Sequence, residues 1–479
     1  MSGAVLLAVV LLIGCEADGW AGSRSRPNAG PLAVGLALSA PRSESRGGEA
    51  SLPRTADASR LQELITQAAP GSEIRVTGGA FFGPLTVDKP LRLVGVGRPV
   101  IDGRNTGTIV RLSAPGIHFS GFVVRRSGDS LLTDDTAILV TADDVTVEGV
   151  EVQEALHGIY VLRGNRFRLL RNQVRGKSWI YDENRGDGIH LHAANDGGIE
   201  SNDFAVVRDG VYFNYSSRIL IKGNRASRLR YGLHYMWSHD NHFVRNEFTE
   251  SVGGAALMYS RGIVFDGNLF ARQRGFRAHG VLFKDVERCR AVGNRFLDNT
   301  EGITLDGALN NRFEDNLVAG NDAGVVEYGN SEGNVFTGNA FLGNGTDLRQ
   351  VGQRSSSRWD DDGRGNYWSS YDGFDLDGDG VGDSPHRLQN LFEFLEGERP
   401  MLRLLAHGPC AAAIRLAERS FPVLRQHETL DRHPLMRVPA AVVRADGAAD
   451  DDAGPGALGA VAGAVLLGGV ALVVLGRRR

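Results

Sequence analysis

The chain has 479 residues, which is enough for several domains or for one long repetitive domain. Its 53 Lys and Arg residues balance 57 Asp and Glu residues, and the net charge of −4 disfavours a nucleic-acid-binding protein that depends on a basic surface. Three cysteines are too few for a disulfide scaffold. Glycine is in excess at 63 residues whereas proline is ordinary at 16, so the composition indicates many tight turns.

Residues 1–20 are typical of an export signal. Residues 5–13 form an apolar run that ends just before Cys15, as in a bacterial lipoprotein signal, although no basic residue precedes the run. We therefore expect an exported protein, with lipidation of Cys15 as an alternative to simple cleavage. Residues 21–57, rich in Ser, Arg, Pro and Gly, are predicted to be a linker.

Residues 58–72 are predicted to contain a short amphipathic helix. Leu61, Leu64, Ile65 and Ala68 would lie on one side of it. Because an uncovered sheet edge invites strand addition, we expect this helix to cap the N-terminal edge of the strands that follow.

Residues 73–352 repeat with a period of 22 residues. A glycine precedes an alternating apolar run in each repeat, and an asparagine follows it fourteen or fifteen residues later. The glycines are Gly158, Gly188, Gly210, Gly232, Gly254, Gly280, Gly302 and Gly324. Coils of three short strands that stack ~4.8 Å apart would bury such apolar faces in one continuous core. The period therefore predicts an all-β fold, a right-handed parallel β-helix of about twelve turns.

Two details of the repeat concern its interior and its binding side. Asparagines at equal positions of successive coils can form a hydrogen-bonded ladder. Residues 176–186 and 271–279 contain extra residues that break the period. Insertions in a solenoid emerge on one face and often mark the side that binds partners.

The second and fourth residues after each glycine point outward, because side chains alternate along a strand. These positions and the turn after them supply candidate copper ligands, namely His190, His192, His234, Met236, Met258 and His239. Thioether sulfur and imidazole nitrogen suit copper, above all Cu(I). The alternative is that these side chains pack beneath a loop or a partner helix.

Residues 353–388 are rich in Asp and Gly and contain a second candidate metal site. Its ligands would be Asp375, Asp377, Asp379 and Asp383. Carboxylates that alternate with glycine can wrap a calcium ion with oxygen ligands. His386 stands where an EF-hand would place its bidentate glutamate, so a solvated acidic turn is the alternative.

The C-terminal region has three predicted parts. Residues 389–439 are mostly helical in pattern, and residues 440–456 read as a second linker. Residues 457–476 are apolar or small and long enough to span a membrane as one helix. The arginines that follow would stay in the cytoplasm and leave the body of the protein outside. The alternative is a Gly- and Ala-rich tail without a membrane role.

The main alternative function is an extracytoplasmic protein that binds carbohydrate or cleaves polysaccharide, since many β-helices do so. Such enzymes need paired carboxylates, or a cation with a basic residue, in a groove along the coils. Among the outward positions of the repeat, Asp306 is the only acid. We therefore expect no catalytic site.

Several strings in the chain resemble the NosD family of exported β-helix maturation factors of nitrous oxide reductase. They are residues 231–240 (YGLHYMWSHD), 256–262 (ALMYSRG), 365–371 (GNYWSSY), 377–383 (DGDGVGD), 416–424 (LAERSFPVL) and 434–436 (PLM). The resemblance covers residues 58–439. Generic sugar-binding β-helices share the 22-residue coil but lack the C-terminal helical strings, so the resemblance is specific.

The resemblance implies a non-enzymatic role outside the cytoplasm. A protein of this family sits on an ABC transporter of permease and ATPase subunits, receives copper from a small chaperone lipoprotein, and passes it to apo nitrous oxide reductase. The resemblance also implies that residues 402–436 dock on the permease. The apolar stretch 457–476 and the lipoprotein-like Cys15 are unusual for the family. They predict direct tethering of this protein to the periplasmic or extracytoplasmic face of the membrane.

Overall fold

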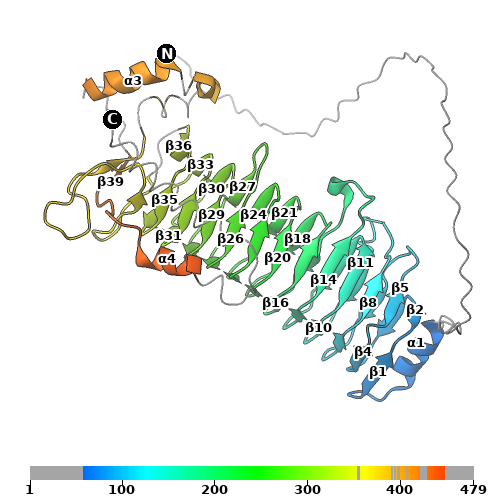
Figure 1. Ribbon diagram of the computed structural model, residues 1–479. Coiled ribbons are helices and arrows are strands. Elements are labelled where there is room, and N and C mark those ends of the chain that lie inside the picture. The colour runs from blue at the N-terminus through cyan, green and yellow to red at the C-terminus, as the bar shows by residue number, and fades with distance from the viewer. Residues whose placement is uncertain are drawn as a thin grey trace, which may run out of the picture. The chain divides into compact units, whose positions relative to one another are not determined.

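The computed structural model describes residues 58–352, 356–389, 392, 395, 400–405, 408–420 and 429–447. Within them, the body of the protein is a right-handed parallel β-helix, as the 22-residue period predicts (Figure 1). The predicted export signal (residues 1–20), the first linker and the apolar stretch 457–476 lie outside the described residues. In the part of the chain that the structure describes, no helix is both long and apolar enough to cross a membrane.

Three parallel sheets form the walls of the β-helix, and each strand pairs with the strand one coil later. Sheet A contains β1 (Glu73–Thr77), β4 (Arg92–Val96), β7 (His118–Ser120), β10 (Thr146–Glu148), β13 (Arg168–Leu170), β16 (Gly198–Glu200), β19 (Leu220–Lys222), β22 (His242–Val244), β25 (Val264–Asp266), β28 (Arg290–Val292), β31 (Arg312–Glu314) and β34 (Val335–Thr337). Sheet B contains β2 (Ala80–Phe82), β5 (Val100–Asp102), β8 (Val123–Arg125), β11 (Glu151–Ala155), β14 (Gln173–Gly176), β17 (Asp203–Ala205), β20 (Arg225–Ser227), β23 (Glu247–Thr249), β26 (Leu269–Ala271), β29 (Arg295–Leu297), β32 (Leu317–Ala319), β35 (Ala340–Leu342) and β37 (Tyr367–Trp368). Sheet C contains β3 (Leu85–Val87), β6 (Val110–Leu112), β9 (Thr136–Val140), β12 (His157–Leu162), β15 (Ile189–His192), β18 (Asp209–Asn214), β21 (Tyr231–Met236), β24 (Gly253–Met258), β27 (His279–Lys284), β30 (Glu301–Asp306), β33 (Ala323–Tyr328) and β36 (Thr346–Val351).

The N-terminal end of the β-helix is covered by helix α1 (Ala58–Gln67), which ends earlier than the predicted range of residues 58–72. Leu61 and Ile65 from this helix are buried in the core. The side chain of Gln62 exchanges two hydrogen bonds with the backbone of Thr86, at 2.8 and 3.0 Å. Helix α1 thus occupies the edge that would otherwise be open to strand addition.

The interior of the β-helix combines stacked phenylalanines with a ladder of asparagines. Rings of Phe243 and Phe265 stack on adjacent coils, with 4.8 Å between their centroids. The asparagine ladder consists of Asn172, Asn202, Asn224, Asn246, Asn268, Asn294, Asn316, Asn339 and Asn366. Each amide group donates to the side-chain oxygen of the next asparagine at 2.8–3.0 Å. The ladder satisfies polar groups that burial would otherwise leave unpaired.

The C-terminal region departs from the predicted boundaries. Residues 353–388, expected to be a loop region, supply β37 to sheet B, so that sheets A and C have twelve strands and sheet B has thirteen. Short strands β38 (His386–Arg387) and β39 (Leu430–Asp431) pair antiparallel. Among the residues that the structure describes, the further helical elements with given bounds are η1 (Asp182–Asn184), η2 (Pro400–Leu405), α3 (Pro409–Ser420) and α4 (Ala440–Gly447). Residues 440–456, expected to be a linker, therefore begin with a helix.

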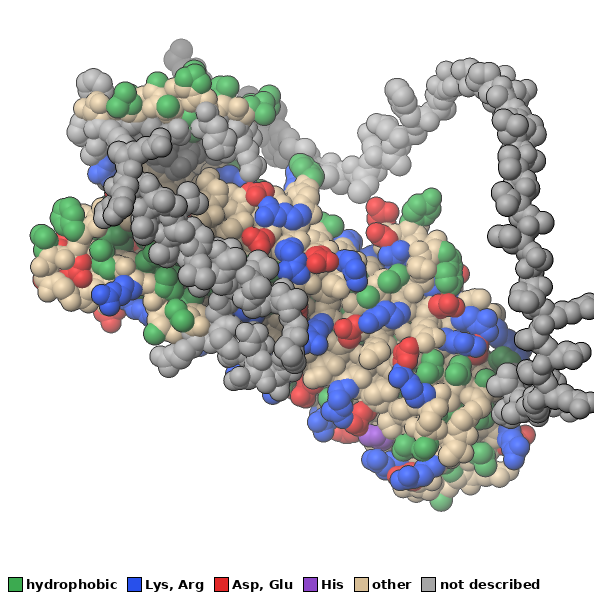
Figure 2. All heavy atoms as spheres, viewed as in Figure 1, with side chains coloured by type: hydrophobic (Ala, Val, Ile, Leu, Met, Phe, Trp, Pro, Cys, Tyr) green, Lys and Arg blue, Asp and Glu red, His purple; other side chains and the backbone are tan. Residues whose placement is uncertain are grey.

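Charges on the outer surface pair from coil to coil. Arg218 forms two hydrogen bonds with Asp196, which lies 22 residues earlier, and Arg166 pairs with Asp144 in the same way. On the face seen in Figure 2, basic and acidic side chains are interspersed. Because opposite charges are paired in this way, they do not form an extended positively charged surface.

Candidate metal-binding face of sheet C

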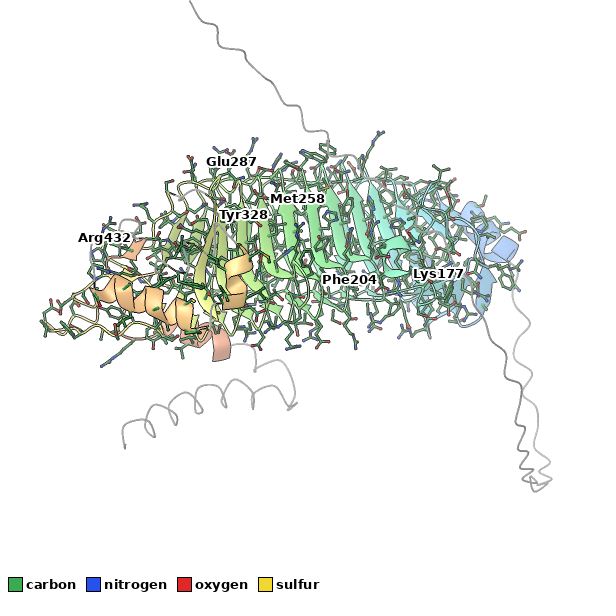
Figure 3. The ribbon with its side chains drawn as sticks, turned by 90° about the horizontal axis from the view of Figure 1, so that it is seen from above. Lys177, Phe204, Met258, Glu287, Tyr328 and Arg432 are labelled. Atoms are coloured by element: carbon green, nitrogen blue, oxygen red, sulfur yellow. The ribbon has the colours of Figure 1, made fainter. Side chains whose placement is uncertain are left out.

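The outward face of sheet C carries two rows of side chains, each at paired positions of successive strands. The first row is His190, Tyr212, His234 and Ala256, and the second is His192, Asn214, Met236 and Met258. Met258 lies midway along the β-helix in Figure 3. Because the rows stand two residues apart on each strand, both project from the same face of the sheet.

Met236 and Met258 are direct cross-strand partners on β21 and β24. Both side chains are half-buried, as is that of His234, which precedes Met236 by two residues. The hydroxyl group of Tyr212 donates to the sulfur of Met236 at 3.8 Å. The structure thus places two thioethers and one imidazole on neighbouring positions of one face.

A buried carboxylate holds the His234 ring. Oδ2 of Asp209 lies 3.0 Å from Nδ1 of His234, and Arg230 donates from Nε to Oδ1 of Asp209 at 2.9 Å. Asp209 is fully buried. Nη2 of Arg230 also lies 3.2 Å from the same Nδ1. In the neutral tautomer whose Nδ1 proton is donated to Asp209, the Nε2 lone pair is free. In that tautomer His234 is oriented as metal-ligating histidines are.

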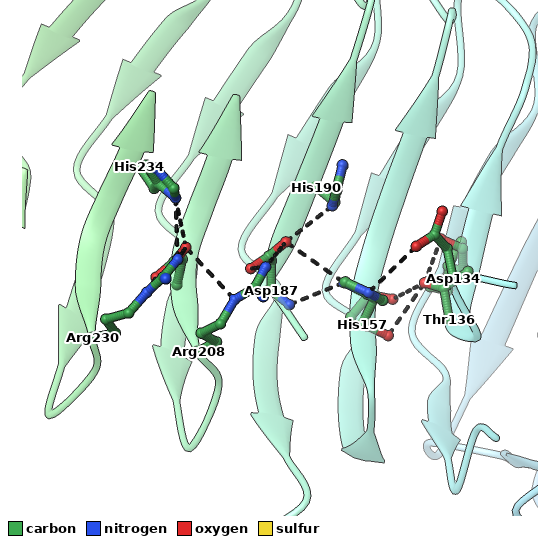
Figure 4. Close-up of polar contacts among 11 residues, drawn as sticks. Asp134, Thr136, His157, Asp187, His190, Arg208, Arg230 and His234 are labelled. Carbon is green, nitrogen blue, oxygen red and sulfur yellow. Dashed lines mark hydrogen bonds and ion pairs between the residues drawn. The ribbon is translucent and has the colours of Figure 1, made fainter. Parts of the chain in front are cut away.

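The same arrangement recurs around His190 (Figure 4). Oδ2 of Asp187 lies 3.0 Å from Nδ1 of His190, and Arg208 approaches Oδ1 of Asp187 at 3.1 Å. Burial alone would raise the pKa of Asp187, but the hydrogen bond from His190 and the neighbouring His157 and Arg208 side chains hold this pKa well below its usual range. Asp187 is therefore ionised and keeps the proton of His190 on Nδ1.

His157 supports this cluster from the preceding coil. With Asp187 and His190 it forms a group whose potential ligand atoms lie within 4.8 Å of one another. Its Nδ1, however, accepts a hydrogen bond from the backbone N–H of Asp187 at 3.0 Å. A neutral His157 then carries its proton on Nε2 and has no lone pair left for a metal. We therefore interpret His157 as a support for Asp187 rather than as a ligand.

Two further predicted ligands differ in position. His192 lies on β15 beside His190, and burial, followed by the nearby charge of His190, lowers the pKa of His192. His239 lies in the turn after β21, where its backbone forms a bridge with Arg261. His239 is therefore outside the strand that presents His234 and Met236.

The predicted calcium ligands lie together in an acidic loop. Asp375, Asp377 and Asp379 place carboxylate oxygens within 4.8 Å of one another. The carboxylate of Asp375 accepts hydrogen bonds from the backbone N–H groups of Gly378 and Gly380, at 2.6 and 2.9 Å. Asp383 is not in this group, and its carboxylate accepts from the N–H of Leu376 at 2.5 Å. These backbone contacts shape the loop, and calcium binding there stays a prediction.

Sequence reasoning missed the residues that orient the two histidines. Asp187 and Asp209 stand 22 residues apart, each just before a repeat glycine, and Arg208 and Arg230 show the same spacing. This 22-residue spacing of an aspartate and an arginine is the sequence signal from which these residues could have been predicted. The outward aromatic residues Tyr215, Trp237 and Tyr259 were missed as well.

These three aromatic residues, here called the aromatic strip, follow the second row along one edge of sheet C. Trp237 stacks on Tyr215 and on Tyr259, with 5.4 and 5.3 Å between ring centroids and interplanar angles of 9° and 14°. All three remain at least 39% exposed, so the strip presents ring edges to solvent. Each follows directly after Asn214, Met236 or Met258 and thus borders the histidine and methionine side chains.

Comparison with solved structures finds other proteins of similar fold at low sequence identity. The A-module of a mannuronan C-5 epimerase from Azotobacter vinelandii is 16% identical, with a TM-score of 0.45 over 66% of this chain and 96% of that chain. The catalytic domain of a GH87 α-1,3-glucanase is 11% identical, with a TM-score of 0.47 over 64% of this chain and 68% of that chain. At these values the similarity carries no information about function.

Comparison of the amino-acid sequence identifies the family more specifically than comparison of the fold. The model of the family described as "Periplasmic copper-binding protein (NosD)" matches residues 170–373. A protein of Pseudomonas aeruginosa named "Probable ABC transporter binding protein NosD" is 33% identical, over 88% of this chain and 98% of the relative. A protein of the same name from Stutzerimonas stutzeri is 29% identical, over 76% of this chain and 87% of the relative. The identity extends over nearly the whole length of the first relative, and this chain therefore belongs to the NosD family.

Proposed function

We propose that this protein is an exported, non-enzymatic accessory factor of nitrous oxide reductase maturation. It docks on the permease and ATPase subunits of an ABC transporter, accepts copper from a chaperone lipoprotein and passes it to the apo-reductase. The family supports this proposal, because its description names copper binding and a periplasmic location, and its relatives are named for binding an ABC transporter. Copper is the cargo of such a protein rather than a resident cofactor.

The observation that carries the proposal is the cross-strand pair Met236 and Met258 beside His234. Two thioethers and one imidazole are a soft donor set that favours Cu(I) over harder cations. The Asp209 carboxylate, 3.0 Å from Nδ1, leaves Nε2 of His234 free for a metal. The three side chains are half-buried rather than enclosed, which suits an ion that must be received and released.

The membrane and transporter contacts are part of the same proposal. Residues 402–436 supply the transporter-docking element, and in this range helix α3 leaves Leu416 66% exposed, as a helix that binds a partner would. Residues 457–476 tether the protein to the membrane, and lipidation at Cys15 would add a second anchor. The two anchors would keep the β-helix at the extracytoplasmic surface, where the transporter is.

The test is anaerobic Cu(I) titration of the full-length protein in competition with a chromogenic chelator. Met236→Ala/Met258→Ala should weaken Cu(I) binding by at least about tenfold, because the remaining imidazole is a single ligand. Met401→Ala is the matched control, since Met401 is 77% exposed in η2, outside sheet C. Equal Cu(I) affinity of the wild type and the double variant would refute the relay site.

A further inference from the structure

We infer that the outer face of sheet C carries a second, separate metal site, formed by His190, His192 and Asn214, that takes a divalent transition-metal ion. The proposed copper relay needs only His234, Met236 and Met258, so this nitrogen- and oxygen-donor site goes beyond it. The sequence alone suggested one continuous patch of histidine and methionine.

Tyr212 separates the two sets of ligands. Its ring lies between the imidazoles of His190 and His234, with centroid distances of 4.7 and 5.0 Å. The strands that carry the two histidines, β15 and β21, are two coils apart, which corresponds to ~9.6 Å at the usual strand spacing. An imidazole ligand binds a metal at ~2 Å, so one ion cannot reach both histidines around the intervening ring.

His190 and His192 form a His-x-His pair on β15 and project from the same face. Asp187 holds Nδ1 of His190, at 3.0 Å, and so directs the Nε2 lone pair away from the carboxylate. Alternate residues of a strand stand ~6.6 Å apart on one face, within reach of two imidazoles that share one ion. Two neutral imidazoles on one face can chelate a single ion.

Asn214 supplies a third donor. It is the direct cross-strand partner of His192 on the next coil. Its Oδ1 atom is buried and accepts no hydrogen bond from any residue that the structure describes. A buried carbonyl oxygen without a partner is destabilising, and coordination to a cation held by His192 would satisfy it.

The two sites differ in softness. Two imidazoles and an amide oxygen suit borderline divalent ions such as Cu(II) and Zn(II), whereas an imidazole with two thioethers suits Cu(I). The two sites thus select different ions on one face, and the divalent site would bind Cu(II) more tightly than Zn(II), following the usual order of affinities.

The experiment is a Cu(II) titration of the full-length protein followed by electron paramagnetic resonance, with Zn(II) displacement as a second arm. The wild type should bind one Cu(II) with splitting from two imidazole nitrogens, and excess Zn(II) should remove that signal. His190→Ala/His192→Ala should weaken Cu(II) binding by at least about tenfold. Met236→Ala/Met258→Ala should leave it within about twofold while losing Cu(I), so failure of this site and failure of the copper relay are read separately.

Asn214→Ala is the second ligand variant, and it leaves the contact between His190 and Asp187 intact. It should weaken Cu(II) binding severalfold without lowering the thermal midpoint of the metal-free protein. The matched control is His242→Ala, since His242 is exposed on β22 of sheet A. Loss of Cu(II) in Met236→Ala/Met258→Ala as large as in the histidine variant would show a single shared site. Cu(II) affinity within about twofold of wild type in both His190→Ala/His192→Ala and Asn214→Ala would overturn the inference.

Discussion

Asp209 and His234 lie on successive coils, and Oδ2 of the buried carboxylate is 3.0 Å from Nδ1 of the imidazole. The contact spans 25 residues of sequence and depends on the register between β18 and β21. The contact holds the ring orientation of an otherwise ordinary surface histidine and favours the tautomer whose proton is on Nδ1.

Asp209→Asn should therefore lower the Cu(I) affinity of the protein by about 10- to 100-fold, the usual effect of removing a carboxylate behind a metal-binding histidine. The measurement is the same anaerobic chelator competition. Asp196→Asn is the matched control, because Asp196 also pairs with an arginine of the next coil, Arg218, but on the exposed surface. If both variants bind Cu(I) like the wild type, Asp209 has only a structural role.

Together with the proposed copper relay, the aromatic strip predicts where the proposed chaperone docks. Metal transfer requires ligands of both proteins to meet, so the partner must cover the surface beside Met236 and Met258. Exposed Trp and Tyr residues dominate the binding energy of many interfaces. Trp237→Ala should weaken binding of the copper-loaded chaperone by at least about tenfold.

The Cu(I) affinity of Trp237→Ala itself should stay within about twofold of the wild type, because the indole ring is not a ligand. Phe374→Ala is the control, as Phe374 is 60% exposed in the acidic loop rather than beside sheet C. Biolayer interferometry with the immobilised chaperone measures both variants. An unchanged dissociation constant for Trp237→Ala would place the chaperone elsewhere.

The asparagine ladder predicts a large effect of one internal substitution. Asn246 donates to Asn268 and to the carbonyl of Ile221, both at 2.9 Å, and accepts from Asn224. Asn246→Ala leaves several buried groups unpaired, each costing about 1–3 kcal/mol. The midpoint of urea unfolding should fall clearly. Asn330→Ala removes hydrogen bonds with Gly307 and Asp306 only at the exposed surface and should lower the midpoint far less. Equal midpoints for the two variants would contradict a stabilising ladder.

His386 predicts a loss of stability in acid. Burial lowers its pKa from 6.5 to about 4. Between these values the unfolded chain binds a proton that the folded protein does not, so stability is full above pH 6.5 and falls as the pH drops towards 4. The shift corresponds to at most about 3 kcal/mol. His386→Gln should flatten the dependence of unfolding free energy on pH in this window.

Asp431 acts in the opposite sense, because burial raises its pKa from 3.8 to about 6. The cost of burying its charge is relieved as the pH falls from about 6 to 3.8. Asp431→Asn should therefore make the loss of stability in acid steeper, whereas His242→Gln, on the exposed surface, should leave it unchanged. Parallel profiles for the wild type and both buried-site variants would refute these assignments.

The sequence by itself determined the parallel β-helix, its core and the placement of Met236 beside Met258. A fixed 22-residue period repeats the same local preferences in every coil, so equal positions must stack. The asparagine ladder and the outward direction of His234 follow from that stacking. The repeated asparagine predicts the ladder, and the alternation of apolar side chains along each strand predicts the outward direction of His234.

Only the tertiary structure decided which side chains meet across coils. Tyr212 stands between His190 and His234, and this divides one predicted patch into two. Trp368 and Asp431 meet across 63 residues, where the buried carboxylate ends the asparagine ladder. Such contacts depend on the lengths of insertions and on how the last coil closes, and no local period encodes either of them.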